Sequence, residues 1–287
     1  MSDRNLNLVI SEAARKLEKV GIEAGAAEAE LILCDLLDCT RLHLFLQGSM
    51  LLNDALMEKF NAIVEKRLTR YPLQYILGSS WFFGRKFKVN EAVMVPCPET
   101  EILMDSVLRS ARFCPSTPVK ILDIGTGSGV LALTLKLENP ELDITAVDIS
   151  EEALAVAREN AARFKIESNV RLCRSDLFAA IAGDEKFDII ASNPPYITIG
   201  DYEGLPPEVK ADPQVSLLAG DQGLDVIERI LTEAPDYLNV PGYLIFEVGD
   251  NQAEGIFEIV DQDKRYSDCL LIKDLADIDR IVLCKVK

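Results

Sequence analysis

From residue 119 onward the chain alternates short apolar runs with longer amphipathic segments, and this alternation constrains the fold more than any other feature. Apolar runs bounded by Gly, Pro or polar residues predict strands at 119–124, 143–147, 169–173, 187–191, 242–248, 268–272 and 280–286. Helical spacing predicts helices at 128–138, 151–163, 223–238 and 251–260. Such alternation is typical of an α/β protein with a doubly wound, mostly parallel sheet.

The first part of the chain has a different pattern, which predicts a small α-helical bundle over residues 1–77. Apolar residues recur at helical spacing in 5–20, in 24–37 and after Asn53, a suitable N-cap. Residues 78–95 read as a β-hairpin linker that turns near Gly84, and we expect its aromatic residues, Trp81 included, in the interdomain core. The sheet domain then covers residues 96–287, beginning with a loop and a helix from Thr100 to about Arg112.

Charge and composition narrow the possible partners. Residues 1–80 carry 9 Lys and Arg against 11 Asp and Glu, residues 81–287 carry 21 against 36, and the net charge is −17. An acidic surface repels phosphate backbones, which argues against a nucleic-acid substrate. The seven cysteines form no Cys-x-x-Cys pair and His43 is the only histidine, so no metal site is predicted. Without an apolar run near 18 residues or a signal-peptide layout, we expect a cytoplasmic protein that does not bind membranes.

A tetrapeptide, Asn193-Pro194-Pro195-Tyr196, directly follows the predicted strand at 187–191. Two adjacent prolines cannot continue a sheet, because neither has an N–H to donate and each fixes φ. The strand therefore ends there and presents Asn193 at its carboxyl end, where open α/β sheets bind ligands. The structural alternative is an ordinary Pro-Pro turn in which the asparagine forms an Asx-turn.

This tetrapeptide suits the transfer of a group to a planar, non-basic nitrogen, such as that of a side-chain amide or an exocyclic aromatic amine. The Asn193 side-chain oxygen and the Pro194 carbonyl can each accept one N–H of an NH₂ group. That pair fixes the angle of the nitrogen and favours positive charge developing on it. The Tyr196 ring can lie against the planar group. Asn193, Pro194, Pro195 and Tyr196 are therefore the predicted catalytic and substrate-binding residues.

The predicted strand at 119–124 runs into a glycine-rich loop, Gly125-Thr126-Gly127-Ser128-Gly129, and a helix follows at once. Glycines at a strand-to-helix turn let a ligand approach the backbone closely. The helix N-terminus can receive a carboxylate group. The spacing is Gly-x-Gly-x-Gly, which differs from the Gly-x-Gly-x-x-Gly of nicotinamide-binding loops.

Four further residues, Asp148, Asp176, Leu177 and Asn193, complete the predicted cofactor site. Asp148 ends the next strand, where a carboxylate can accept hydrogen bonds from both ribose hydroxyls of a nucleoside. Its alternative role, capping the helix at 151, is already supplied by Ser150. Together with Asn193-Pro194-Pro195-Tyr196, the loop points to S-adenosylmethionine. Asp176 would then face the adenine and Leu177 or Phe178 would cover its plane, with Asn193 also near the cofactor.

Six segments give the chain a family resemblance. They are Pro-Leu-Gln-Tyr-Ile-Leu-Gly at 72–78, Val-Pro-Cys-Pro-Glu-Thr-Glu at 95–101, Asp-Ile-Gly-Thr-Gly-Ser-Gly at 123–129, Ser-Asn-Pro-Pro-Tyr at 192–196, Gly-Leu-Asp at 223–225 and Glu-Val-Gly at 247–249. In these segments the chain resembles the protein-(glutamine-N5) methyltransferases that modify peptide-chain release factors. The glycine-rich loop and Asn-Pro-Pro-Tyr fit many amino-group methyltransferases, whereas the first two segments are more specific.

The resemblance implies a seven-stranded class I methyltransferase domain behind a helical domain that helps to dock the release factor. The substrate would be the glutamine of the release factor's Gly-Gly-Gln loop, and the product would tune translation termination. By the same resemblance, Gly125–Gly129, Asp148 and Asp176-Leu177 bind the cofactor, and Asn193–Tyr196 bind the glutamine amide. The chain departs from the family at Cys97, where an arginine is usual, so the role of that arginine is open.

Two rival functions fit the same motifs. Adenine N6 presents the same planar NH₂ group, but its methylation in DNA needs a Lys/Arg-rich recognition segment that this chain lacks. A non-catalytic partner-binding protein could also keep the cofactor fold. The intact Asn193 argues against that second rival, and a cofactor-turnover assay separates the two classes.

Overall fold

The computed structural model describes residues 5–48 and 50–287, and the chain divides into two compact units. The helical unit comprises the residues up to Gly78 together with Pro206–Ala211. The sheet unit comprises Ser79–Leu205 and Asp212–Lys287. The boundary expected after residue 77 lies next to Gly78, but the inclusion of residues 206–211 in the helical unit was not predicted.

The helical unit is built from short amphipathic helices around one apolar core. Its described helices are α1 (Leu6–Lys19), α2 (Gly25–Leu37), α3 (Arg41–Leu46), α4 (Asp54–Leu68), α5 (Leu73–Leu77) and α9 (Pro207–Lys210). Asn53 caps α4 as predicted, since its side-chain oxygen accepts a hydrogen bond from the Leu56 N–H at 2.9 Å. The sequence pattern did not reveal α3, α5 or α9, which are each shorter than two turns.

An ionic cluster around the buried Arg67, formed with the partly buried Glu28, Arg70 and Glu208, ties α9 to α2 and α4. The Arg67 side chain is only 5% exposed; its Nε donates to Glu28 at 2.7 Å and its Nη1 donates to Glu208 at 2.7 Å. Arg70 clasps the same Glu208 carboxylate through Nε at 2.6 Å and Nη2 at 2.7 Å. Such two-pronged contacts are the strong form of an ion pair. Glu208 therefore anchors residues 206–211 in the helical unit.

The predicted hairpin is confirmed, with β1 (Ser79–Phe82) pairing antiparallel with β2 (Arg85–Lys88). Phe83 and Gly84 have φ values of +48° and +72°, as a two-residue hairpin turn with the twist of its strands requires. Phe82 is buried in the core of the sheet unit. Trp81, in contrast, is 63% exposed and does not belong to the core of the sheet unit, so its place in an interdomain core stays a prediction.

The sheet unit contains a seven-stranded sheet of order β5-β4-β3-β6-β7-β9-β8. The strands are β3 (Lys120–Ile124), β4 (Asp143–Asp148), β5 (Val170–Arg174), β6 (Phe187–Ser192), β7 (Leu238–Glu247), β8 (Tyr266–Lys273) and β9 (Asp279–Val286). The pairs from β5 to β7 are parallel, whereas β9 pairs antiparallel with both β7 and β8. The predicted fold class is thereby confirmed.

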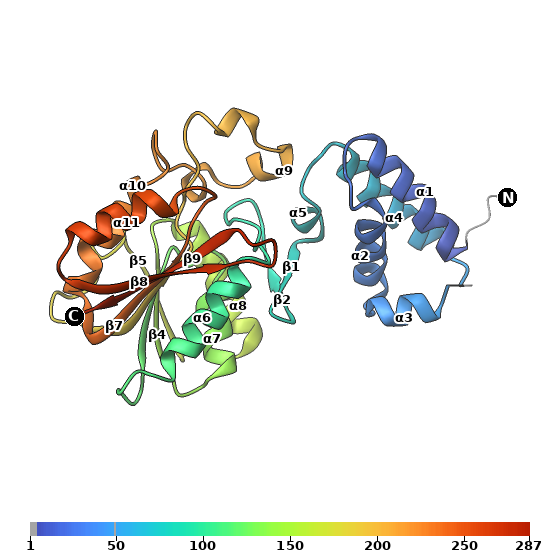
Figure 1. Cartoon of the computed structure of the whole chain (residues 1–287). Helices are drawn as coiled ribbons and strands as arrows, with labels where there is room; N and C mark the ends of the chain where they lie inside the picture. Colours follow the sequence, from blue (N-terminus) through green and yellow to red (C-terminus); the bar gives the residue numbers. More distant parts are fainter. Residues whose placement is uncertain (1–4, 49) are drawn as a thin grey trace. The chain divides into compact units, whose positions relative to one another are not determined.

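Helices cover both faces of this sheet (Figure 1). The helices α6 (Thr100–Ala111), α7 (Val130–Glu138) and α8 (Glu151–Phe164) lie on one face, and α10 (Asp225–Glu233) and α11 (Ala253–Gln262) lie on the other. Successive residues of β3 serve opposite cores, since Ile121 packs beneath the first group and Leu122 beneath the second. Both strand faces are therefore apolar, which explains the continuous apolar runs in the sequence.

The order of the strands reverses between β3 and β6, and this reversal positions the site. From β3 the chain moves outward to β4 and β5, and from β6 it moves to the opposite side through β7. The loops that leave β3 and β6 therefore diverge and open a crevice at the carboxyl ends of the strands. Among the residues that the structure describes, no helix is long and apolar enough to span a membrane.

Candidate active site

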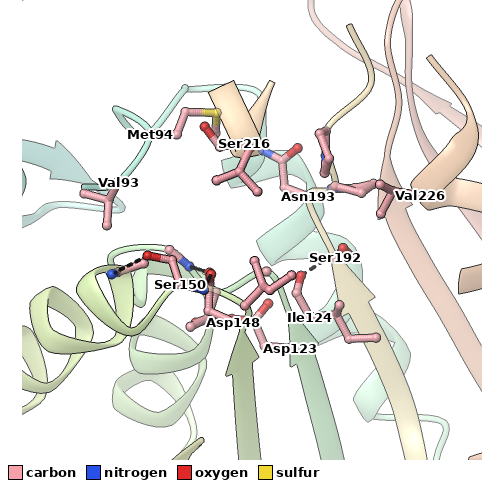
Figure 2. A pocket seen from close by; sticks show the side chains of 18 of the residues that line it. Val93, Met94, Asp123, Ile124, Asp148, Ser150, Ser192, Asn193, Ser216 and Val226 are labelled. Atoms are coloured by element: carbon pink, nitrogen blue, oxygen red, sulfur yellow. Dashed lines mark hydrogen bonds between the residues drawn. The ribbon is translucent and has the colours of Figure 1, made fainter. Parts of the chain in front are cut away.

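A pocket opens at this point of reversal, and its lining brings most of the predicted residues together. Its lining includes Gly125, Thr126, Gly127 and Ser128 of the glycine-rich loop, Asp148, Asp176, Leu177, Asn193, Pro194 and Pro195, whereas Gly129 does not line it. In Figure 2 Asp148 lies on one side of the pocket together with Asp123, Ile124 and Ser192, and Asn193 lies on the other side. The carboxyl ends of β3, β4 and β6 thus supply its floor.

The glycine-rich loop needs its glycines for conformation and for close packing. Gly125, Gly127 and Gly129 have φ values of +73°, +56° and +83°, a region that L side chains rarely adopt. A Cβ on Gly129 would lie 2.9 Å from the Leu133 Cδ1 atom, whereas a Cβ on Gly127 would meet nothing within 4 Å. Gly129 is therefore required where α7 begins, and Gly127 leaves open space where a ligand can approach the backbone.

Asp148 holds the glycine-rich loop and faces the pocket. Its Oδ2 accepts a hydrogen bond from the Gly127 N–H at 2.8 Å, and its Oδ1 accepts one from the Ser150 N–H at 2.9 Å. Ser150 caps α8 through its own hydroxyl, as predicted. Burial raises the pKa of Asp148 above its ordinary value, against the lowering effect of these N–H groups. Each carboxylate oxygen keeps a lone pair that can accept a ribose hydroxyl.

In the loop after β5, Asp176 and Leu177 line the pocket and Phe178 belongs to the core. Leu177 lines the pocket, with a φ of +48°. Phe178 is fully buried and stacks on Tyr237 with a centroid distance of 4.7 Å, so of the two residues proposed to cover an adenine only Leu177 is placed to do so. Asp176 lines the pocket and forms an ion pair with Arg229 at 3.0 Å.

Asn193 is fixed by a polar chain that sequence reasoning missed. Its Nδ2 donates to the Thr100 hydroxyl at 3.0 Å, and that hydroxyl donates to the Glu247 carboxylate at 2.8 Å. Burial raises the pKa of Glu247 to about 7, although the Thr100 hydrogen bond lowers it. Both residues stand in segments that carry the family resemblance, but their 147-residue separation hid the contact.

Tyr196 turns toward the same carboxylate and is not among the residues that line the pocket. Its hydroxyl lies 3.5 Å from Glu247, a long contact, and burial raises its pKa. The role predicted for the Tyr196 ring, covering a planar substrate group, stays a prediction. Cys97 lies near Glu247, and burial raises the pKa of its thiol to about 12, so this side chain is neutral.

Asp123 is another residue that the sequence reasoning did not single out, besides Thr100 and Glu247. It lies in β3 just before the glycine-rich loop, lines the pocket, and accepts a hydrogen bond from the Thr126 hydroxyl at 2.6 Å. Burial raises its pKa to about 7. A carboxylic acid at the end of the strand that precedes such a loop was the signal available in the sequence.

Together these features define a class I methyltransferase, a class whose members use S-adenosylmethionine as the methyl donor. The reversal of strand order, the glycine-rich loop after β3 and the acidic end of β4 fit a nucleoside with a charged tail. A family model described as "Methyltransferase small domain" matches residues 100–203. A methyltransferase of Pyrococcus furiosus, 22% identical, superimposes with a TM-score of 0.50 over 71% of this chain and 90% of that one, which shows the same fold.

Two comparisons narrow the class to one family. A family model described as "PrmC N-terminal domain" matches residues 9–78. The release factor glutamine methyltransferase of Koribacter versatilis is 35% identical over 97% of both chains. That of Nitratidesulfovibrio vulgaris is 34% identical over 99% of this chain and 96% of its own. The chain belongs to the release factor glutamine methyltransferase family.

Proposed function

We propose that this protein transfers a methyl group from S-adenosylmethionine to the side-chain amide nitrogen of the glutamine in the Gly-Gly-Gln motif of peptide-chain release factors. The observation that carries the proposal is the presentation of Asn193 at the carboxyl end of β6. Its Nδ2 is occupied by Thr100, and no protein group among the described residues donates to its Oδ1 or to the Pro194 carbonyl. Two consecutive residues that line the pocket therefore each keep an acceptor without a protein donor, which suits one NH₂ group.

The chain's own residues account for the chemistry through positioning and charge. The bound donor supplies an electrophilic methyl carbon on a sulfonium centre. Asn193 Oδ1 and the Pro194 carbonyl each accept one N–H of the substrate amide, which directs the nitrogen at that carbon and favours the positive charge that develops. The methylated amide then loses a proton to water, so no strong base is needed before attack. The proposed mechanism gives no role to His43, which lies on α3 of the helical unit.

The glycine-rich loop and Asp148 hold the donor in this proposal. Asp148 accepts the ribose hydroxyls, Leu177 covers the adenine, and the N-terminus of α7 faces the donor's carboxylate. The open space over Gly127 and the lone pairs left on Asp148 support this arrangement. In the same proposal the helical unit docks the release factor. The exposed apolar side chains of Leu42, Phe45 and Leu46 on α3 support a docking role.

Replacement of Asp148 by alanine should weaken S-adenosylmethionine binding by about 1–3 kcal/mol, because charge-assisted bonds to the ribose are lost. Calorimetry measures this directly. The matched control is Asp143→Ala, which removes an exposed carboxylate from the opposite end of the same strand and should leave the affinity unchanged. Equal affinities for the Asp148 variant and the wild type would assign the ribose to another residue.

The substrate is tested with labelled S-adenosylmethionine and three acceptors. We expect label in a release factor, none in its variant with the motif changed to Gly-Gly-Ala, and none in duplex DNA. Asn193 and Pro194 can hold any planar NH₂ group, so the choice depends on how the substrate is delivered. An enzyme that acts on a duplex must flip out a base and hold flanking phosphates, which requires cationic surface. Label in DNA, or undiminished label in the Gly-Gly-Ala variant, would overturn the proposed function.

A further inference from the structure

In the hydrogen bonds that connect Asn193, Thr100 and Glu247, the chemistry of the groups decides which one donates and which one accepts. Glu247 is buried, with a residue exposure of 2%, and its Oε2 lies 2.8 Å from the Thr100 hydroxyl oxygen. Above its pKa of about 7 this carboxylate is ionised, and an ionised carboxylate accepts hydrogen bonds and donates none. The single hydroxyl proton of Thr100 is therefore committed to Glu247, and the Thr100 oxygen is left with its lone pairs. Toward Asn193, this hydroxyl can act only as an acceptor.

That restriction decides which way the side-chain amide of Asn193 faces. An amide has a donor end and an acceptor end of nearly the same shape, so packing alone distinguishes them poorly. Because Thr100 presents only an acceptor, the NH₂ end turns to it, at 3.0 Å. The carbonyl end then faces the pocket. The reverse orientation would bring two acceptors together behind Asn193 and present a donor to a substrate NH₂ group, which also donates.

We propose that Thr100 and Glu247 are positioning residues that set the orientation of the Asn193 amide, so that its oxygen is the atom presented to the substrate nitrogen. The two residues come from different elements, since Thr100 begins α6 and Glu247 ends β7. Their role rests on the proposed function only in that Asn193 is the acceptor of the substrate amide. Neither residue touches the reacting atoms; both act through Asn193.

The surroundings of Glu247 favour this use of a buried carboxylate. Arg280 on β9 is the positive charge that acts on it, while Glu99 before α6 adds negative charge. Tyr196 contributes a hydroxyl at 3.5 Å, and the Cys97 thiol nearby is neutral. Thr100 thus makes the shortest side-chain hydrogen bond to Glu247. The hydrogen bonds from Thr100 to Glu247 and from Asn193 to Thr100 connect this carboxylate to the pocket.

Thr100→Val is the decisive variant, because valine keeps the shape of threonine and removes the hydroxyl. We expect kcat for release-factor methylation to fall about 10- to 100-fold, with cofactor affinity and KM for the donor within about twofold of the wild type. Thr100→Ser keeps the hydroxyl and should restore kcat to within about threefold. The matched control is Thr134→Val: Thr134 is equally buried, but its hydroxyl has no partner, so this change should leave kcat and the melting temperature unaltered.

A double-mutant cycle then tests whether Glu247 acts through Thr100. Glu247→Gln, assayed at about pH 8.5 so that the wild-type carboxylate is ionised, should lower kcat alone but cause no further loss in the Thr100→Val background. Additive losses would overturn the relay, as would a Thr100→Val enzyme with wild-type kcat or a serine variant as slow as the valine variant. A loss of cofactor affinity parallel to the loss of kcat would also overturn it, since that pattern indicates a merely structural role.

A readout independent of turnover separates this proposal from the proposed function. The side-chain NH₂ resonances of Asn193, assigned by their disappearance in Asn193→Ala, should shift in Thr100→Val and stay in place in Thr100→Ser. Unshifted resonances in the valine variant would show that Thr100 does not hold the amide. A wild-type protein that labels no release factor but shows the expected NMR shifts would overturn the assigned substrate and leave the orientation of Asn193 established.

Discussion

Replacement of Asn193 by alanine is expected to lower the rate of methyl transfer by about 10²–10³-fold or more, while donor affinity stays within a few-fold of the wild type. The asparagine oxygen contacts the substrate nitrogen in our proposal, and the interaction strengthens as positive charge develops on that nitrogen. The loss should therefore appear in kcat and not in the donor's dissociation constant. Single-turnover labelling measures the first quantity and calorimetry the second.

Asp148→Ala gives the opposite pattern and serves as the comparison. Asp148 faces the same pocket from the other side (Figure 2), but its partners are the glycine-rich loop and the donor. Its loss should raise the donor's dissociation constant and leave the rate at saturating donor much less affected. If Asn193→Ala weakened donor binding as much as it slowed transfer, Asn193 would belong to the donor site, and the proposed mechanism would lose its main contact.

Replacement of Arg67 by methionine is expected to cost about 3–5 kcal/mol of the free energy of unfolding. The substitution removes both guanidinium contacts of Glu28 and leaves Glu208 with Arg70 alone, and a partly buried charge without its partner is far more costly than a missing surface pair. Denaturant unfolding of the full chain, followed by helical circular dichroism, measures the change. The loss of stability should be confined to the helical unit. Donor affinity, measured at denaturant concentrations below the unfolding transition, should therefore stay unchanged.

The control for this variant is Arg41→Met in the same unit. Arg41 also pairs with a glutamate, Glu30, but its side chain is 59% exposed. Exposed pairs contribute about 0–1 kcal/mol, so the two arginine variants should differ severalfold in cost. A cost for Arg67→Met as small as that for Arg41→Met would mean that the ionic cluster does not hold the helical unit together.

Acid should reveal the same cluster. Burial raises the pKa of Glu208, but hydrogen bonds from Arg70 and Arg67 outweigh it and hold that pKa at about 2. A carboxyl whose pKa is lowered on folding stabilises the fold above its unfolded pKa of about 4.5, and this contribution is lost as the pH falls toward 2. The free energy of unfolding of the helical unit, followed by circular dichroism, should therefore fall over that pH interval. In Glu208→Gln the dependence of this free energy on pH should be less steep.

The strands at the centre of the sheet were predictable because their sequences record burial on both faces. Six of the seven predicted strands match the observed ones to within two residues at each end, since apolar runs flanked by Gly, Pro or charge have few other uses in a domain of this size. The exception is β7, which starts at Leu238 and not at 242. It passes through Pro241, a residue that normally argues against a strand. The helix predicted at 223–238 accordingly ends early, at Glu233.

The parts that could not be predicted depend on contacts between distant residues. The pairing of Thr100 with Glu247 joins a helix start to a strand end, and periodicity within either segment says nothing of the other. The choice between Leu177 and Phe178 depended on a positive φ at Leu177 and on the Tyr237 ring. The assignment of residues 206–211 to the helical unit depends on Glu208, whose two arginine partners lie 138 and 141 residues earlier.

The ionic cluster also changes what counts as an exchangeable module in this family. Because the helical unit includes residues 206–211, it is encoded by two segments that are separated in the sequence by most of the sheet unit. A graft that replaces only the residues before Gly78 would pair a foreign arginine set with the resident Glu208. A deletion at the same point would strand the Glu208 carboxylate without either guanidinium. Chimeras between relatives should therefore recover stability only when both segments, the residues up to Gly78 and residues 206–211, are taken from the same parent.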